Sequence, residues 1–185
     1  MRGRSRSRAS SAVIGNVLLI AIVVVLAATA SAYLFGATDG SPDPAPTVAQ
    51  STGEFVPQDG NDGGVVRITH RGGDTLRVAD LEIVVDAQAV CGKVGRLVNL
   101  PASGGDPRPT SEFVRGDDVF DNSFNSVTGP IGEDGRTVDG RWSSGETATF
   151  RLAGTECRLT SGESITVRVV HTPTNAVVIK QTLTA

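Results

Sequence analysis

The chain has 185 residues, of which 39% are hydrophobic and only 4% aromatic, and its 20 acidic and 17 basic side chains leave a net charge of −3. Four of the basic residues are arginines among the first eight positions, whereas every acidic residue follows Gly36. Beyond the arginines the chain therefore carries 13 basic and 20 acidic side chains, a net charge of −7. Such a balance argues against nucleic acid or an anionic lipid surface as a partner of this part, because phosphate neutralisation requires clustered Lys and Arg.

The first predicted element is an uncharged segment from Ala12 to Phe35. As a helix of about 24 residues rising 1.5 Å each, it matches a hydrocarbon core of ~30 Å, and it shows no polar face. Its clearly polar interruptions are Asn16, Thr29 and Ser31. We predict a membrane-spanning helix over residues 10–36. Because the arginines precede it and acidic residues follow it, the N-terminus is expected in the cytoplasm and the remaining chain outside.

Three interpretations of this segment remain open from its composition. A general secretory signal would be cleaved after Ala30-Ser31-Ala32, although the uncharged run is longer than an ordinary signal core. An uncleaved membrane anchor is the second interpretation. The third depends on the residues that connect the arginines to the apolar run.

Residues 8–15 read Arg-Ala-Ser-Ser-Ala-Val-Ile-Gly. This stretch resembles the N-terminal signature of archaeal type IV pilins of haloarchaeal type, which commonly reads R-G-V-S-P-V-I-G and continues as an apolar helix. Ala9 replaces the usual glycine and Ala12 the usual proline. The positions that match are Arg8, Ser11, Val13, Ile14 and Gly15.

The resemblance implies a class III signal peptide, in which a membrane prepilin peptidase removes residues 1–9 by cutting between Ala9 and Ser10, next to Arg8. It implies that the remaining helix first spans the membrane and then forms the filament core. Further implied partners are other pilin copies, membrane lipid, a pilus assembly ATPase and a membrane platform protein. Small residues permit close helix packing, and we expect this role for Ala12, Gly15, Ala21 and Ala28.

Pro42, Pro44 and Pro46 follow the helix and disfavour further helix, so residues 37–54 are predicted to be an extended linker. Residues 55–185 are predicted to form one extracellular β domain. Alternating apolar residues indicate strands within 65–70, 79–86, 147–153 and 164–172, and the last of these is predicted to form a hairpin with 175–184. We therefore predict an all-β antiparallel sandwich or small barrel. Residues 99–140 keep no clear period and are interpreted as long surface loops.

Chemistry-bearing residues are few in this domain. Cys91 and Cys157 can form one disulfide in an oxidising exterior, with buried free thiols as the alternative. Two cysteines without a CxxC pair make a zinc site improbable. Neither histidine, His70 or His171, lies next to a ligand or nucleophile motif.

Calcium binding has equally little support. The stretch beginning at Asp59 has the wrong acidic spacing for a calcium loop. Asp117, Asp118 and Asp121 could gather a cation, but a solvated acidic turn is the preferred interpretation. We predict no catalytic residues, no metal and no cofactor.

The sequence thus favours a structural subunit of a surface filament used for adhesion or cell contact, and not an enzyme. The alternative is a membrane-anchored or secreted β-sandwich binding protein that does not polymerise.

Overall fold

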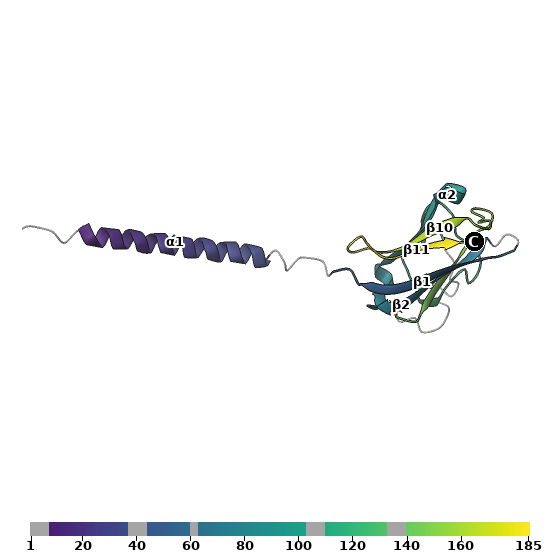
Figure 1. Cartoon of the computed structure of the whole chain (residues 1–185), viewed down its shortest axis with the longest axis horizontal. Helices are drawn as coiled ribbons and strands as arrows, with labels where there is room; N and C mark the ends of the chain where they lie inside the picture. Colours follow the sequence, from purple (N-terminus) through teal and green to yellow (C-terminus); the bar gives the residue numbers. More distant parts are fainter. Residues whose placement is uncertain (1–7, 37–43, 60–62, 103–109, 133–139) are drawn as a thin grey trace, which may run out of the picture. The chain divides into compact units, whose positions relative to one another are not determined.

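The computed structural model describes residues 8–36, 44–59, 63–102, 110–132 and 140–185. Side chains in the first of these ranges are described from Val13 to Tyr33. The chain divides into two compact units, Met1–Asp43 and Pro44–Ala185. The first contains one long helix and the second a β domain (Figure 1).

Helix α1 extends over Arg8–Gly36 and confirms the predicted apolar helix. Leucine and alanine favour helix, and a segment without proline can satisfy all its internal backbone groups by itself. Glycine at position 36 and the prolines beyond it disfavour continuation. The element therefore ends where its apolar run ends.

The first sheet of the β domain is antiparallel and has four strands in the order β1, β2, β9, β7. Their bounds are β1 Val48–Pro57, β2 Gly64–Gly73, β9 Thr147–Leu152 and β7 Val127–Thr128. The predicted strands within 65–70 and 147–153 are confirmed as β2 and β9. Phe55 lies opposite Val66, and its ring packs over Gly64, where a Cβ would clash with it.

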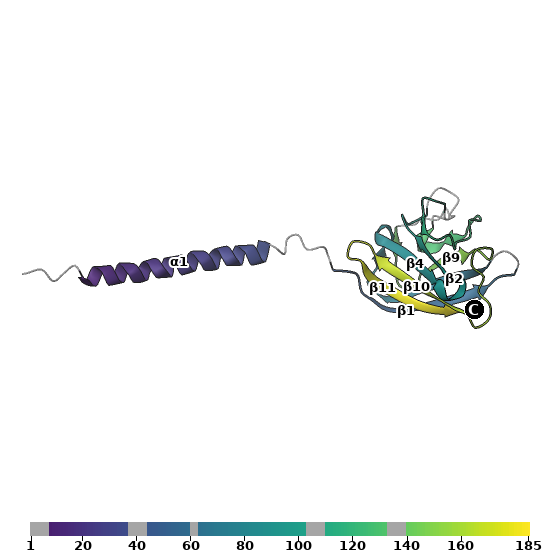
Figure 2. The ribbon, with the colours of Figure 1, turned by 90° about the horizontal axis from the view of Figure 1, so that it is seen from above.

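The second sheet has five strands in the order β11, β10, β4, β5, β6, all antiparallel. Figure 2 shows β11, β10 and β4 side by side. Their bounds are β4 Leu81–Ala87, β5 Lys93–Leu97, β6 Val114–Gly116, β10 Ser164–His171 and β11 Ala176–Thr184. The predicted hairpin is confirmed, with Ser164 opposite Thr184 and His171 opposite Ala176. Asn175 has a φ of 54° in the connecting turn, a conformation that Asn tolerates better than most residues.

Smaller elements connect the two sheets. Strands β3 Leu76–Arg77 and β8 Arg141–Trp142 form a separate antiparallel pair. The short helices are η1 Val78–Asp80, α2 Gln88–Cys91 and η2 Gly129–Ile131.

The hydrophobic core lies between the two large sheets. The predicted inward residues are buried on β10, β9, β2 and β4. They are Ile165, Val167 and Val169, then Ala148, Phe150 and Leu152, then Val66 and Ile68, and finally Leu81, Ile83 and Val85. Since successive side chains of a strand point to opposite faces, this burial follows from the period of two in the sequence. The domain is an antiparallel β-sandwich.

The edge strands β1 and β11 of the two sheets lie beside each other in both views (Figures 1 and 2). The Gln181 side-chain amide donates to the Ser51 carbonyl oxygen at 3.1 Å and contacts the Ser51 hydroxyl at 2.8 Å. A Cβ on Gly53 would lie 2.5 Å from Leu183, so glycine allows β1 to approach β11 closely. The two edges therefore protect each other from pairing with foreign strands.

The predicted linker is too long at its C-terminal end, because β1 begins at Val48 inside it. The inward positions of its first half are Ser51 and Gly53, which are only half-buried and lack apolar side chains. Without an apolar alternation, the sequence pattern missed this part of the strand. The strand forms because β2 supplies hydrogen-bonding partners from Val48 to Pro57.

The interpretation of residues 99–140 as surface loops is also wrong for much of the described part. This region contains β6, β7 and η2 and contributes buried side chains to the core. They are Phe113, Val119, Phe120, Val127 and Ile131. Phe120 forms an isolated antiparallel bridge with Leu152, and the Val119 carbonyl accepts from the Ala153 amide. Irregular backbone thus covers the open side of the sandwich. Its buried side chains follow no regular spacing, so the sequence pattern could not reveal them.

Candidate functional site

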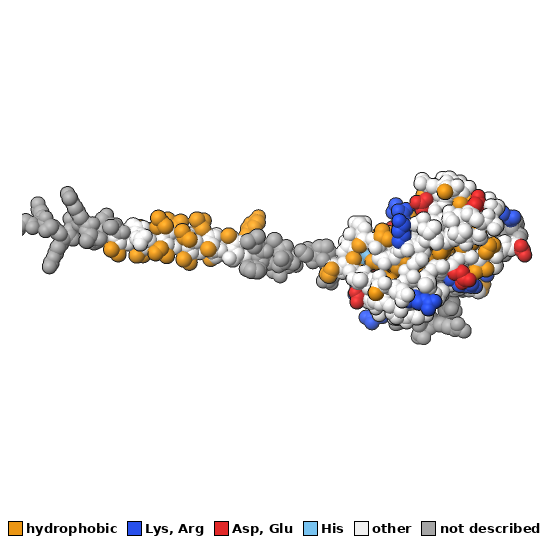
Figure 3. Space-filling view, in the orientation of Figure 1, with side chains coloured by type: hydrophobic (Ala, Val, Ile, Leu, Met, Phe, Trp, Pro, Cys, Tyr) orange, Lys and Arg blue, Asp and Glu red, His pale blue; other side chains and the backbone are white. Residues whose placement is uncertain are grey.

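Helix α1 of the first unit has an apolar surface that this chain does not cover. The stretch Val13–Tyr33 has 21 residues, a mean hydropathy of 2.7 and no part buried within the chain. Its large apolar side chains are 55 to 64% exposed from Val13 to Leu26. Figure 3 shows hydrophobic side chains along this described stretch. A helix that is apolar on all sides needs lipid or other helices around it.

The helix is long enough to cross a membrane, since 21 residues rise about 31 Å. One polar interruption is satisfied internally, because the Thr29 hydroxyl donates to the Leu26 carbonyl at 3.0 Å. Asn16 is exposed near the N-terminal end of the span. Neither residue prevents insertion in lipid.

The small residues predicted to pack helices do not form one stripe. At about 100° per residue, Ala21 and Ala28 lie within roughly 20° of each other, whereas Gly15 lies about 120° or more away from both. Ala21 and Ala28 are exposed, and nothing lies within 4 Å of a Cβ built on Gly15. The side chain of Ala12 lies outside the described ones. Close helix packing at these four residues stays a prediction, and it would involve more than one side of the helix.

The predicted processing site, Arg8, Ala9 and Ser10, belongs to the helical backbone of α1. Its side chains, and all of residues 1–7, lie outside the part that the structure describes. The cut after Ala9 therefore stays a prediction.

In the β domain, the two histidines are placed on different sheets. His70 on β2 is fully buried, its Nε2 lies 2.8 Å from the Asp74 carbonyl oxygen, and its ring meets the edge of Trp142 at 6.5 Å between centroids. Since a carbonyl only accepts, Nε2 carries the proton and Nδ1 has no partner. His171 on β10 contacts the Thr174 hydroxyl at 2.8 Å. His70 therefore functions as a core residue.

Two carboxylates of the segment after β6 accept hydrogen bonds from backbone amides. Asp117 accepts from the Val94 amide at 2.8 Å, and Asp121 accepts from the Ser123 amide at 2.9 Å. Among the described residues, no three His, Cys, Asp or Glu side chains are grouped as metal ligands. Asp59 is described, but residues 60–62 of the stretch considered for calcium are not.

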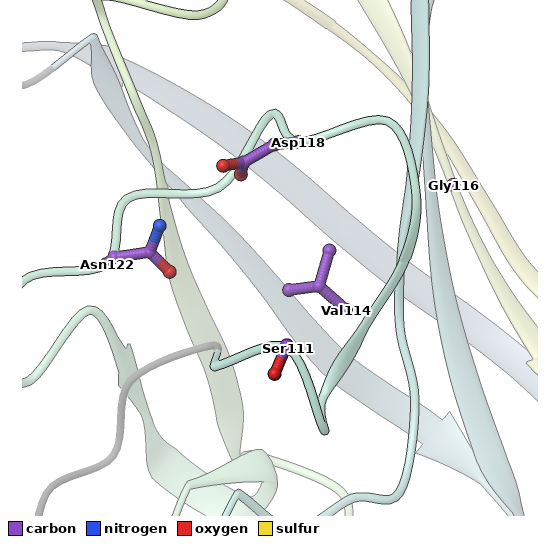
Figure 4. A pocket seen from close by; sticks show the side chains of 5 residues that line it. All are labelled: Ser111, Val114, Gly116, Asp118 and Asn122. Atoms are coloured by element: carbon purple, nitrogen blue, oxygen red, sulfur yellow. The ribbon is translucent and has the colours of Figure 1, made fainter.

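A shallow hollow lies beside β6. It is lined by Ser111, Val114, Gly116, Asp118 and Asn122 (Figure 4). The Asp118 carboxylate projects into it from the segment that follows β6. Asp118 forms no ion pair with another described residue.

Cys91 and Cys157 are joined by a disulfide with their Cα atoms 5.6 Å apart. Cys91 ends α2, next to the second sheet, and Cys157 follows β9 of the first sheet. An ion pair supports this connection, because Lys93 Nζ lies 2.6 Å from the Glu156 carboxylate. The two bonds together hold one end of the sandwich closed.

Replacing Cys91 and Cys157 together by alanine is expected to lower the free energy of unfolding by about 2 to 4 kcal/mol, because the cross-link restricts the unfolded chain. The loop that it closes spans a sequence separation of 66 residues. Denaturant unfolding of the full chain in detergent would measure the loss. The Lys93→Gln variant is the control, since a half-exposed ion pair contributes only about 1 kcal/mol or less. Equal stability of the cysteine variant and the wild type would contradict the prediction.

These features define a class of protein first: a single N-terminal helix, long and apolar enough to span a membrane, is followed by an antiparallel β-sandwich. Residues 8–50 match a family model described as "Archaeal Type IV pilin, N-terminal". The N-terminal segment is therefore similar to that of archaeal type IV pilins, which confirms the resemblance of residues 8–15. This family is structural and not enzymatic.

A relative from Archaeoglobus fulgidus, named "Uncharacterized protein", is 25% identical over 95 residues, or 51% of this chain. The chain spans 64% of the length of that relative. This similarity adds no function to the family match.

Sequence reasoning missed one feature of the β domain, the outer face of the first sheet. Arg67, Thr69 and Arg71 alternate along β2, and Thr147, Thr149 and Arg151 alternate along β9. The alternation is visible in the sequence. Only the pairing of Arg67 with Thr149 and of Thr69 with Thr147 places them together on one face.

Proposed function

We propose that this protein is a structural subunit of an archaeal type IV pilus-like surface filament, used for adhesion or cell contact. The observation that carries the proposal is the apolar span Val13–Tyr33, no part of which is buried within the chain, inside a segment that matches the pilin N-terminal model. A helix of this kind serves equally well inside a bilayer and inside a bundle of identical helices. The protein would act by polymerising.

The arginines support a defined order of events. While they are attached, they hold the N-terminus in the cytoplasm, because cationic residues beside a span are costly to translocate. Once residues 1–9 are removed, the helix begins at Ser10 with no charged side chain up to Phe35. Such a helix can leave the bilayer for the filament core without transferring an ionised side chain.

The apolar character of the span also indicates that filament assembly needs an energy supply. Apolar surface in lipid is already out of water, so helix assembly gains little from hydrophobic transfer. Extraction into a filament then requires close packing and an external energy supply. A pilus assembly ATPase and a membrane platform protein would provide that supply.

The second candidate is a membrane-anchored or secreted β-sandwich that does not polymerise. The mature N-terminus distinguishes the three cases when the purified surface fraction is analysed by mass spectrometry. A start at Ser10 supports the pilin, a start at Tyr33 indicates a general secretory product, and a start at Met1 indicates an uncleaved anchor.

The processing step gives a second test. The Ala9→Phe variant is expected to yield at least roughly tenfold less cleaved chain, because a clash of only about 1.4 kcal/mol in the bound peptide suffices for this factor. The intact mass of the membrane-bound chain would then still include residues 1–9. The matched control is Ala32→Phe, which alters the alternative cleavage site and should leave processing at Ala9 unchanged. Loss of processing in the control alone would favour the secretory alternative.

A further inference from the structure

The outer face of the first sheet carries the positive charge of an otherwise acidic domain. Its outward side chains come from β1, β2 and β9. We call this surface the basic face, and its polar and charged residues are Thr52, Glu54, Arg67, Thr69, Arg71, Thr147, Thr149 and Arg151. Three arginines against one glutamate give it a net charge of +2, whereas the chain beyond residue 9 has a net charge of −7.

Two of these arginines are available to a partner. Arg67 is engaged with Glu54, 3.4 Å away, whereas Arg71 donates only to the Thr52 hydroxyl at 3.2 Å. Arg71 and Arg151 form no ion pair with any residue that the structure describes. Arg71 is exposed and Arg151 half-exposed. Both guanidinium groups can therefore pair with carboxylates brought from outside.

The threonines make the face polar around Arg71, whereas at its other end Val65 lies opposite Arg151 and Val56 opposite Val65. Thr69 and Thr147 lie opposite each other and share a hydrogen bond of 2.8 Å between their hydroxyls. Together with Thr52 they line a shallow hollow between the arginines. The face has no aromatic side chain on which a sugar ring could stack, so its chemistry suits a carboxylate-bearing protein surface.

A complementary surface exists on the same domain, and one end of it adjoins the basic face. The segment from residue 112 to 121 contains β6, at the edge of the second sheet, and reaches β9 at its last residue, where the Asp121 amide donates to the Arg151 carbonyl at 3.0 Å. We call it the acidic segment, and its charged residues are Glu112, Arg115, Asp117, Asp118 and Asp121, net −3. Among the described residues, Glu112 and Asp118 have no ion-pair partner. The nearby cation Lys93 is paired with Glu156.

We infer that the basic face of one β domain docks against the acidic segment of a second copy. The inference rests on the proposed filament, in which acidic domains are held close together and repel one another. Contact at the basic face replaces repulsion by attraction, because opposite charges steer and orient association. Successive copies in the proposed filament are related by one repeated step, so this contact between two different surfaces is heterologous and continues from copy to copy.

The test uses charge reversal in full-length chains produced in cells that lack the wild-type copy. The basic-face variant is Arg71→Glu with Arg151→Glu, and the acidic-segment variant is Glu112→Lys with Asp118→Lys. Each alone is expected to reduce the sedimented filaments by about tenfold or more, because like charges then meet at every contact. Producing both together should restore filaments, since each reversed surface meets the opposite reversal on the other chain.

The matched control reverses two cations outside the basic face, Arg77→Glu with Lys180→Glu, and should assemble like the wild type. Thermal unfolding of each variant shows whether it folds, and Arg71→Gln with Arg151→Gln replaces the basic-face variant if it does not. Normal assembly of the folded variants, or no rescue by co-production, would overturn the inference. Normal filaments that lose only attachment to an anionic surface would identify an external partner instead. If the wild type forms no filaments, the proposed function fails and this inference with it.

Discussion

The Val24→Asp variant is expected to disappear from both the membrane and the filament. Val24 lies near the middle of the span Val13–Tyr33 and is 60% exposed. An aspartate at the centre of a membrane helix costs about 2.5 to 3.5 kcal/mol on insertion scales. In a helix bundle the same carboxylate would be buried without a counter-ion, which is strongly unfavourable. The variant helix is therefore unstable both in the bilayer and in the helix bundle of the filament.

The comparison for this experiment is Val24→Leu, which keeps the span apolar and should insert and assemble normally. Membrane fractionation reports insertion, and sedimentation of sheared surface material reports assembly. If the aspartate variant still forms abundant filaments, the span cannot form the filament core.

The Phe150→Ala variant is expected to lose about 3 to 5 kcal/mol of the free energy of unfolding, as is usual for deleting a buried phenylalanine. Phe150 on β9 is fully buried and meets Phe120 edge to face with 5.9 Å between ring centroids. Its strand neighbours in the register are Val66 on β2 and Val127 on β7. The ring thus joins the first sheet to the irregular segment that closes the sandwich, and its removal leaves a cavity between them.

Thr149→Ala provides the matched control, because Thr149 is the next residue on β9 and points outward. It should change the free energy of unfolding by roughly 0.5 kcal/mol or less. Denaturant unfolding of the full chain in detergent measures both variants. Equal losses at the two positions would mean that the region around Phe120 does not pack as described.

Periodicity explains which strands were predictable. On β10, every second residue from Ile165 to Val169 is buried, and Thr166 and Arg168 between them are not. The same alternation of apolar and polar residues is visible in the sequence. The first half of β1 carries no such signal, because its inward positions Ser51 and Gly53 contact β11 and not the core. Its pairing depends on β2, which follows it in the chain.

The irregular segment between β5 and β8 was less predictable for a related reason. Phe113, Val119 and Phe120 are buried, but the Phe113 amide donates to Thr110 in a local turn, whereas the Val119 carbonyl accepts from the distant Ala153 amide, so no single period relates them. Phe120 reaches the core through a bridge to Leu152, more than thirty residues later in the chain. Burial of this kind depends on the two sheets already being in place.

The sequence by itself determined the helix and its environment. A helix satisfies its hydrogen bonds within one segment, so length, apolar composition and flanking charge suffice to define it. It also determined that the second unit is built of strands, since alternation is local. The tertiary structure alone decided which strands are neighbours and which outward side chains share a face. Arg71, Thr52 and Thr147 are brought together only by strand pairing across long sequence separations, and the basic face exists because of that pairing.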